Sequence, residues 1–262
     1  FDTDLDAWEE MTGKRPVQLA MPGMNGQPVL KDIAENSPFA GLVVMDVAPT
    51  QLFRPPGGGN PAFAGVLDYW RGEGPARRAS HRLEIPLSKT LAFLDQNYSS
   101  TALIDRLDLP NRGKIGGPVL FPWKLSEVRT DRQYMLWREI ETNERLREHA
   151  IRVWLWRPRP PPSEEVVAAI CADIAASVAK IRARGGEVVF LRPPSTGAYL
   201  AREDEATPRA ATWDRMLREA DAFGIHFQDY ADMQGLELPE LSHLTREDAT
   251  RFTRAYVGVL RE

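Results

Sequence analysis

The sequence predicts an α/β protein in which helices flank a parallel sheet. Two apolar runs, 41–47 (GLVVMDV) and 187–191 (EVVFL), have the length and the β-branched content of buried strands. The first run follows a loop and an amphipathic segment, and the order strand–loop–helix–strand is typical of a βαβ unit. Val43 and Val189 are therefore expected to lie in one sheet.

The first fifty residues are expected to form a helix, a strand, a second helix and then the run at 41–47. Residues 4–12 place apolar side chains on one side of a helix that ends at Gly13. A short strand is expected at 16–20. A loop rich in turn residues follows it and leads into a helix at 29–35.

The same alternation resumes after residue 162. Ser163 is the expected N-cap of a long amphipathic helix, about 164–184, which the pair Gly185–Gly186 ends. The elements expected after it are a strand at 187–191, a helix at 211–220, a short strand at 224–227 and a C-terminal helix that starts after Thr245.

Residues 54–162 interrupt this pattern and are predicted to be a mostly helical insertion within one domain that spans 1–262. Proline-rich seams bound the insertion, and helices are expected near 87–98 and 132–149. Its tryptophans are Trp70, Trp123, Trp137, Trp154 and Trp156. Such an aromatic-rich insertion is typical of a lid or a substrate wall, and equally of the packed interior of a small helical subdomain. Both interpretations stay open.

Composition narrows the functional classes. A net charge of −4 argues against a nucleic-acid surface, and no stretch approaches the ~18 consecutive apolar residues of a membrane span. Cys171 is the single cysteine, so an internal disulfide is excluded, and its apolar helical surroundings predict a core position.

The four histidines have no metal-ligand spacing, and neither a metal nor an organic cofactor is expected. His149 is predicted on a helix surface, and His226 is predicted to be a structural residue of the strand at 224–227.

The stretch 239–248 holds the strongest catalytic candidate. Glu240 lies three residues before His243, and Thr245 with Asp248 forms a capping pair at the start of the next helix. A carboxylate can hold one ring nitrogen of a histidine, while a helix N-terminus disfavours the charged imidazole and leaves the other nitrogen as a base. The alternative is a turn histidine that only bonds its neighbours.

Three segments resemble the SGNH/GDSL hydrolase superfamily: 213–215 (WDR), 225–230 (IHFQDY) and 239–244 (PELSHL). That superfamily carries an Asp-x-x-His motif just before its last helix, and here Glu240 stands in place of the aspartate. The chain is more specifically similar to a bacterial SGNH-like group of poorly defined function. The resemblance covers about 1–47 and 163–262 and implies a flavodoxin-like three-layer sandwich.

The resemblance also implies roles for individual residues. His243 would be the general base, Glu240 its orienting carboxylate, and Gly23 with Asn25 part of the oxyanion site. The family's serine nucleophile follows the first strand in a Gly-x-Ser context. Neither GDS nor GxSxG occurs in the sequence, so the serine is expected upstream of Phe1, in a chain that is N-terminally truncated.

One further departure and one further serine complete the candidate site. The family's third conserved block supplies an asparagine, but the corresponding stretch, 46–51, has none. Ser195 follows the strand at 187–191, at the sheet edge where α/β proteins bind ligands, and is a candidate substrate or oxyanion residue. The alternative for Ser195 is a turn serine beside two prolines.

The function expected from these features is that of an SGNH-type ester hydrolase or acyltransferase on an acylated small molecule or glycan. The alternative is a catalytically silent module that binds a glycan or a partner protein, favoured by the aromatic insertion and the missing asparagine. A Gly-x-Ser just upstream of Phe1 would support the enzyme. The sequence leaves the substrate, the oligomeric state and the compartment open, since an upstream anchor or signal would place the protein outside the cytoplasm.

Overall fold

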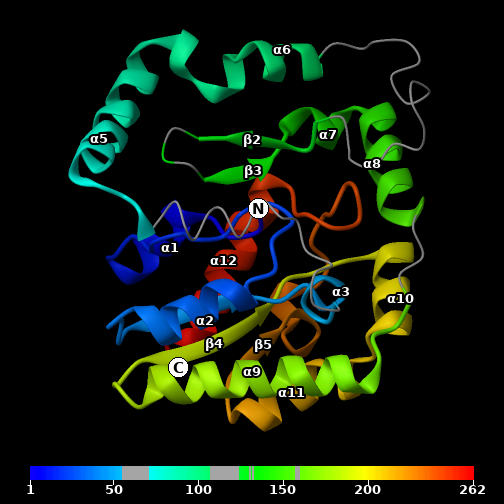
Figure 1. Cartoon of the computed structure of the whole chain (residues 1–262). Helices are drawn as coiled ribbons and strands as arrows, with labels where there is room; N and C mark the ends of the chain where they lie inside the picture. Colours follow the sequence, from blue (N-terminus) through cyan, green and yellow to red (C-terminus); the bar gives the residue numbers. More distant parts are fainter. Residues whose placement is uncertain (55–70, 107–123, 130, 132, 157–159) are drawn as a thin grey trace. The chain divides into compact units, whose positions relative to one another are not determined.

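The computed structural model describes residues 1–54, 71–106, 124–129, 131, 133–156 and 160–262 (Figure 1). The chain divides into two compact units, each assembled from three separate stretches. Unit 1 comprises the described residues of 1–16, 71–158 and 236–254, and unit 2 comprises those of 17–70, 159–235 and 255–262. The first proline-rich seam, Trp70 and Trp123 lie outside the described residues.

Unit 2 contains a parallel sheet of three strands in the order β1–β4–β5: β1 (Leu42–Asp46), β4 (Glu187–Arg192) and β5 (Phe223–His226). In register, Val43 pairs with Val188, and Val189 pairs with both Val44 and Phe223. The prediction that Val43 and Val189 share one parallel sheet is confirmed. Residues 188–192 of β4 are all buried, as expected for a central strand.

The strand predicted at 16–20 is wrong, because this stretch has no regular secondary structure. Val17 and Leu19, which would face the same side of a strand, are 83% and 42% exposed, so no layer covers that side. Pro16 also lacks the N–H that a sheet ladder needs. Within the described sheet β1 is an edge strand, and its first residue, Leu42, is exposed.

The helices of unit 2 are α2 (Gln27–Asn36), α3 (Pro49–Leu52), α9 (Glu164–Arg182), α10 (Gly197–Ala206) and α11 (Trp213–Ala220). At the start of α9, the Ser163 hydroxyl accepts a hydrogen bond from the Val166 N–H (3.4 Å), which confirms the predicted cap. After α9 the chain turns through Gly185, whose φ of +86° favours glycine. The sequence analysis missed α3 and α10.

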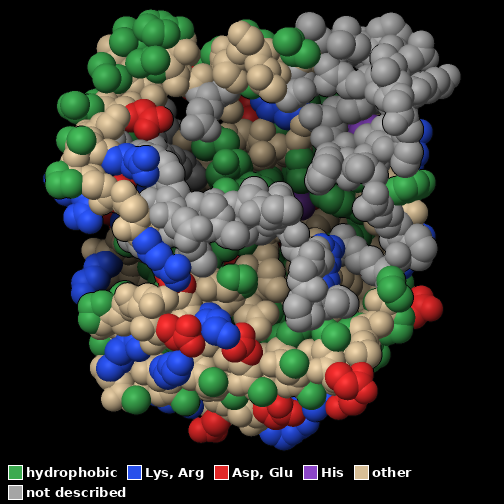
Figure 2. Space-filling model, in the orientation of Figure 1, with side chains coloured by type: hydrophobic (Ala, Val, Ile, Leu, Met, Phe, Trp, Pro, Cys, Tyr) green, Lys and Arg blue, Asp and Glu red, His purple; other side chains and the backbone are tan. Residues whose placement is uncertain are grey.

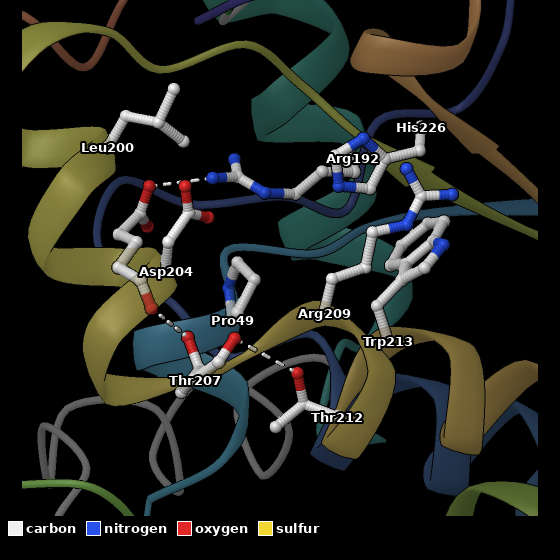
Figure 3. Close-up of a pocket in the computed structure, with 10 residues that line it drawn as sticks. Pro49, Arg192, Leu200, Asp204, Thr207, Arg209, Thr212, Trp213 and His226 are labelled. Atoms are coloured by element: carbon white, nitrogen blue, oxygen red, sulfur yellow. Dashed lines mark hydrogen bonds and ion pairs between the residues drawn. The ribbon is translucent and has the colours of Figure 1, made fainter.

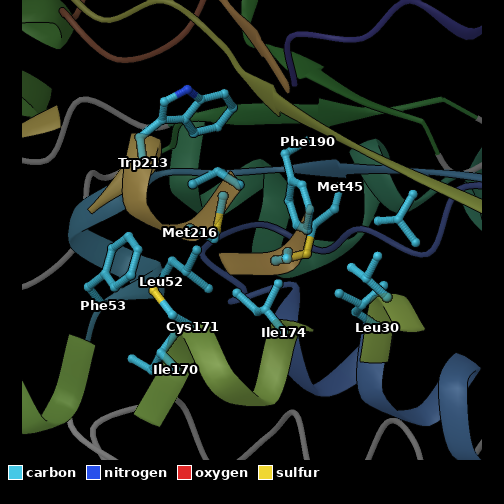
Figure 4. Packing of buried hydrophobic residues seen from close by; sticks show 14 of the residues in the cluster. Leu30, Met45, Leu52, Phe53, Ile170, Cys171, Ile174, Phe190, Trp213 and Met216 are labelled. Carbon is cyan, nitrogen blue, oxygen red and sulfur yellow. The ribbon is translucent and has the colours of Figure 1, made fainter. Parts of the chain in front are cut away.

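The core of unit 2 lies between α9 and the sheet (Figure 4). Ile174, Phe190 and Met216 are fully buried there, on α9, β4 and α11. Cys171 also lies in this core, as predicted, and burial raises the pKa of its thiol to about 11. The thiol is therefore a packing group rather than a nucleophile at neutral pH.

The described exterior of unit 2 carries both signs of charge. Figure 2 shows acidic and basic side chains interspersed over α2 and α9, where Lys31 pairs with Asp173 (2.7 Å) and Lys180 with Glu35 (3.0 Å). Such exposed pairs contribute at most about 1 kcal/mol each. None of the described helices has the length and apolar character that crossing a membrane requires.

Unit 1 is mostly helical. Its helices are α1 (Leu5–Thr12), α5 (Pro75–Thr90), α6 (Ser100–Arg106), α7 (Arg138–Thr142), α8 (Glu144–Trp156) and the first part of α12 (Arg246–Leu260). Two 3₁₀ turns, Ala92–Leu94 and Gln96–Tyr98, follow α5. An antiparallel hairpin, β2 (Ser126–Val128) and β3 (Tyr134–Leu136), was not predicted.

The helix predicted at 132–149 is wrong as one continuous element, because the stretch divides into β3, α7 and α8. Asn143 makes the break: it ends α7, and its side-chain oxygen accepts a hydrogen bond from the Leu146 N–H (3.3 Å) in the first turn of α8. The helix predicted at 87–98 begins earlier, at Pro75, and gives way to the 3₁₀ turns after Thr90. At the N-terminus, α1 is as predicted, with Gly13 at φ +72° after its last turn.

Candidate functional site

The loop 237–245 of unit 1 holds Glu240 and His243 and is closed at its base by two hydrogen bonds. The Thr245 N–H donates to the Glu237 carbonyl (3.0 Å), and the Glu237 N–H donates to the Asp248 carboxylate (2.6 Å). The Thr245 hydroxyl accepts from the Asp248 N–H (3.2 Å), so Thr245 is the predicted cap of α12. The Asp248 carboxylate closes the loop instead of reaching back to Thr245, so the predicted capping pair is formed only in part.

Inside the loop, a tight turn separates Glu240 from His243. The Leu241 N–H donates to the Leu238 carbonyl (3.1 Å), and Leu241 has a φ of +74°. A left-handed conformation costs a residue with a Cβ roughly 1–2 kcal/mol. This strain lies immediately beside the candidate pair, as it does at many functional sites.

Glu240 and His243 form the contact that the sequence predicts. Glu240 Oε1 lies 2.9 Å from His243 Nδ1 and also accepts the His243 backbone N–H (2.5 Å). The indole N–H of Trp154, on α8, donates to Glu240 Oε2. The Glu240 side chain is 0% exposed, whereas the His243 side chain is 18% exposed.

The contact at Nδ1 determines what the other ring nitrogen can do. Because a carboxylate accepts hydrogen bonds, Nδ1 carries the proton in the neutral imidazole, and Nε2 then has a free lone pair. Within the described part of the chain, Nε2 makes no hydrogen bond. His243 is thus arranged as a base with its accepting nitrogen directed away from Glu240.

Aromatic rings surround His243. The Phe1 ring centroid lies 4.4 Å from that of His243, and the Trp154 centroid lies 6.1 Å from it. Tyr134, on β3, packs against Phe1 at 6.3 Å. We refer to Phe1, Tyr134 and Trp154 as the ring cluster.

The N-terminal segment is fixed beside the loop by hydrogen bonds to Leu244, which precedes α12, and to the first half of α12. Asp2 accepts the Leu244 N–H (2.9 Å), and the Asp4 N–H donates to the Thr253 hydroxyl (2.8 Å). The Thr250 hydroxyl donates to the Asp4 carboxylate (2.6 Å). These bonds keep Phe1 and the Asp2 carboxylate next to His243.

The electrostatics of His243 differ from the expectation. Burial lowers its pKa, but the charge and hydrogen bond of Glu240, together with the Asp2 charge, outweigh burial. The net effect is a pKa above the ordinary value of 6.5. The expectation that the helix N-terminus keeps this imidazole neutral is therefore wrong, because the charges of Glu240 and Asp2 favour the protonated ring.

The predicted oxyanion residues, Gly23 and Asn25, belong to unit 2. Gly23 has a φ of +70° in a turn closed by the Met24 N–H and the Met21 carbonyl (3.1 Å). Asn25 Oδ1 accepts the Gln27 N–H (2.9 Å) at the start of α2. These bonds account for both residue types in a loop that leads into a helix, and their place in an oxyanion site stays a prediction.

Ser195, also in unit 2, lies just beyond the carboxyl end of β4, as predicted. Its buried hydroxyl donates to Glu203 Oε2 (2.6 Å) and accepts from the Arg192 guanidinium (2.9 Å). Arg192 and Glu203 form a buried ion pair at 2.6 Å. The hydroxyl of Ser195 is thus already used as both donor and acceptor within this pair.

A small hollow in unit 2 lies at the carboxyl ends of β4 and β5, with room for about one water molecule (Figure 3). Arg192, Arg209, Trp213 and His226 are among its lining residues. Burial, followed by the charges of Arg209 and Arg192, lowers the pKa of His226 to about 3, so its imidazole is neutral near pH 7.

The His226 ring has structural contacts, as the sequence analysis expected. Its Nδ1 accepts the Gln228 N–H (3.2 Å), and the ring packs edge-on against Trp213 at 5.4 Å. His149, by contrast, is buried on α8, so its predicted surface position is wrong.

Among the described residues, no group of three or more His, Cys, Asp or Glu side chains is arranged to hold a metal ion. No family model, curated protein or solved structure matches this chain.

Sequence reasoning missed two features of these sites. Trp154 was noted only as one of several tryptophans, although its indole contacts Glu240 from 86 residues away. The Arg192–Glu203 pair was also missed, but an arginine directly after the apolar run 187–191 was a usable signal. A charged side chain that ends a buried strand must find a partner nearby.

Proposed function

We propose that the protein is an SGNH-type ester hydrolase or acyltransferase that acts on an acylated small molecule or glycan. The observation that carries the proposal is the 2.9 Å contact between Glu240 Oε1 and His243 Nδ1, with the carboxylate buried and the ring partly exposed. A buried carboxylate that orients a histidine is the arrangement that activates a serine hydroxyl in acyl transfer. The flavodoxin-like sandwich implied by the resemblance is part of this proposal.

In the proposed reaction, His243 Nε2 takes the proton of a serine hydroxyl as the serine oxygen attacks the ester carbonyl. Glu240 stabilises the imidazolium that forms, and the imidazolium then returns the proton to the departing alcohol. Water or an acceptor alcohol releases the acyl group by the same steps in reverse. The resemblance assigns the oxyanion role to Gly23 and Asn25.

The proposal takes its serine from residues upstream of Phe1. The Phe1 ring lies 4.4 Å from the His243 ring, and Asp2 bonds the residue that follows His243. A serine shortly before Phe1 would therefore come close to the His243 ring.

A binding module without turnover is the second candidate function, and the ring cluster favours it. Phe1, Tyr134 and Trp154 are all partly exposed around His243. Aromatic rings beside polar groups suit the apolar faces and the hydroxyl groups of a glycan. Such a module would bind an oligosaccharide but would not hydrolyse its esters.

The pH profile of ester hydrolysis is the first expected result. A general base must be unprotonated, so kcat/KM should fall as the pH drops through a pKa that lies above 6.5. Removing the negative charge in Glu240→Gln should move this limb to lower pH, because that charge is the main cause that raises the His243 pKa. The measurement is kcat/KM from pH 5 to 9 for the full-length protein.

Glu237→Gln is the matched control, since Glu237 is exposed, lies in the same loop and loses the same charge. Its profile should coincide with that of the wild type. An activity limb at the same pH in wild type and Glu240→Gln would contradict the proposed role of the pair.

The stability contributed by the charged pair changes with pH in the opposite direction to the activity. It is fully present below pH 6.5 and is lost as the pH rises through the folded-state pKa of His243.

A further inference from the structure

The carboxylate of Glu240 is held by three donors from two different parts of unit 1. Both donors from its own loop, the His243 backbone N–H and Nδ1, bond the same oxygen, Oε1. The other oxygen, Oε2, receives its hydrogen bond from the Trp154 indole on α8. Hydrogen bonds within the loop therefore fix only one of the two carboxylate oxygens.

The bond to Oε2 has an energetic and a geometric consequence. Because the Glu240 side chain is 0% exposed, water does not supply a donor to Oε2. A buried charged oxygen without a partner costs more free energy than a buried neutral group without one. The terminal torsion of a glutamate is also broad, so a carboxylate held at one oxygen is free to rotate away from the imidazole.

The hydrogen bond from Trp154 is more important because residue 240 is a glutamate and not an aspartate. The resembled motif has aspartate, whereas Glu240 has one more methylene and one more torsion to fix. Trp154 lies in the last turns of α8, with its ring 6.1 Å from the His243 ring at an interplanar angle of 54°. The Trp154 indole therefore lies beside both side chains of the pair, and it donates a hydrogen bond to Glu240, which orients His243.

We propose that Trp154 is a positioning residue for the Glu240–His243 pair, whose indole N–H holds Glu240 Oε2 so that Oε1 stays on His243 Nδ1. Its consequence for turnover rests on the proposed function. Its consequence for the titration of His243 does not, because that titration is observable in a protein with no activity.

The test is an NMR titration of the His243 ring in the full-length protein. Trp154→Phe keeps an aromatic ring and removes the N–H. The His243 pKa should fall toward 6.5 by roughly half a pH unit or more. A loss of 1.4 kcal/mol in the interaction that favours the protonated ring corresponds to about one pH unit. Trp156→Phe is the matched control, because Trp156 lies on the same helix, is 49% exposed and undergoes the same substitution. The control should leave the titration unchanged.

A double-mutant cycle with Glu240→Gln asks whether Trp154 acts through the carboxylate. In the Glu240→Gln background, Trp154→Phe should shift the His243 titration no further. An unchanged titration in Trp154→Phe, or the same shift with and without the Glu240 carboxylate, would overturn the inference. If Trp154→Phe does not fold, β-(3-benzothienyl)alanine at position 154 replaces N–H by sulfur at constant ring shape and should give the same shift.

Turnover provides the second arm. With an active full-length enzyme, Trp154→Phe should lower kcat about tenfold at unchanged KM, because a misoriented base affects the chemical step and not substrate binding. A shifted titration in a protein that hydrolyses no ester would refute the proposed function and leave the positioning role intact. An active enzyme in which Trp154→Phe changes neither the His243 titration nor kcat would refute the positioning role and leave the proposed function intact.

Discussion

Replacing His243 with alanine is expected to reduce ester turnover by about 10²–10⁴-fold, the usual contribution of a general base. The pair with Glu240 is the only part of the proposed mechanism that accepts the serine proton, so no other group restores it. The melting temperature should fall as well, because the buried Glu240 carboxylate loses its contact with Nδ1. The measurements are hydrolysis of a generic ester and thermal melting, both on the full-length protein.

His226→Ala is the control for this prediction. The His226 ring is buried against Trp213 and Phe227 in unit 2, so its loss should lower stability and leave turnover in the folded fraction unchanged. A purely structural turn histidine at 243 predicts lost stability with no turnover to lose, so the turnover of the wild type decides between the two cases. Unchanged turnover in His243→Ala would end the enzyme proposal built on this residue.

The largest expected effect on stability is that of Phe190→Ala. Phe190 is fully buried in the central strand β4 and packs in the core of unit 2 (Figure 4). Truncating a buried phenylalanine typically costs about 3–5 kcal/mol, because transfer free energy is lost and a cavity remains. The free energy of unfolding of unit 2 in urea should fall by that amount.

Phe223→Ala on the neighbouring strand is the matched control, since Phe223 is 50% exposed. Its cost should be about 1 kcal/mol or less. Equal losses in the two variants would show that β4 is not the centre of this core.

The parts of the fold that were predicted correctly are those in which local sequence and tertiary packing favour the same element. The run VVFL at 188–191 is apolar throughout and is buried in β4, and Ser163 with Gly185 delimits α9 as expected. The segment 16–20 has strand-like composition but no layer to bury its apolar side chains. Asn143 divides a helical pattern that periodicity alone treats as continuous.

The candidate site was predictable only as far as its contacts are local. Glu240 and His243 are three residues apart, so their spacing alone suggests the 2.9 Å contact. Trp154 and Asp2 reach the same site from distant parts of the sequence, and no local pattern identifies them. The sign of the His243 pKa shift was mistaken for the same reason, because it depends on the balance between burial and two carboxylates.

The measurement that tests the enzyme proposal most directly is labelling with a fluorophosphonate, in which the oxygen of an activated serine displaces fluoride from phosphorus. Peptide mapping of the full-length protein should find the label on a serine upstream of Phe1, and His243→Ala should abolish it. Absence of any label, a label that persists without His243, or a label on Ser195 would contradict the account.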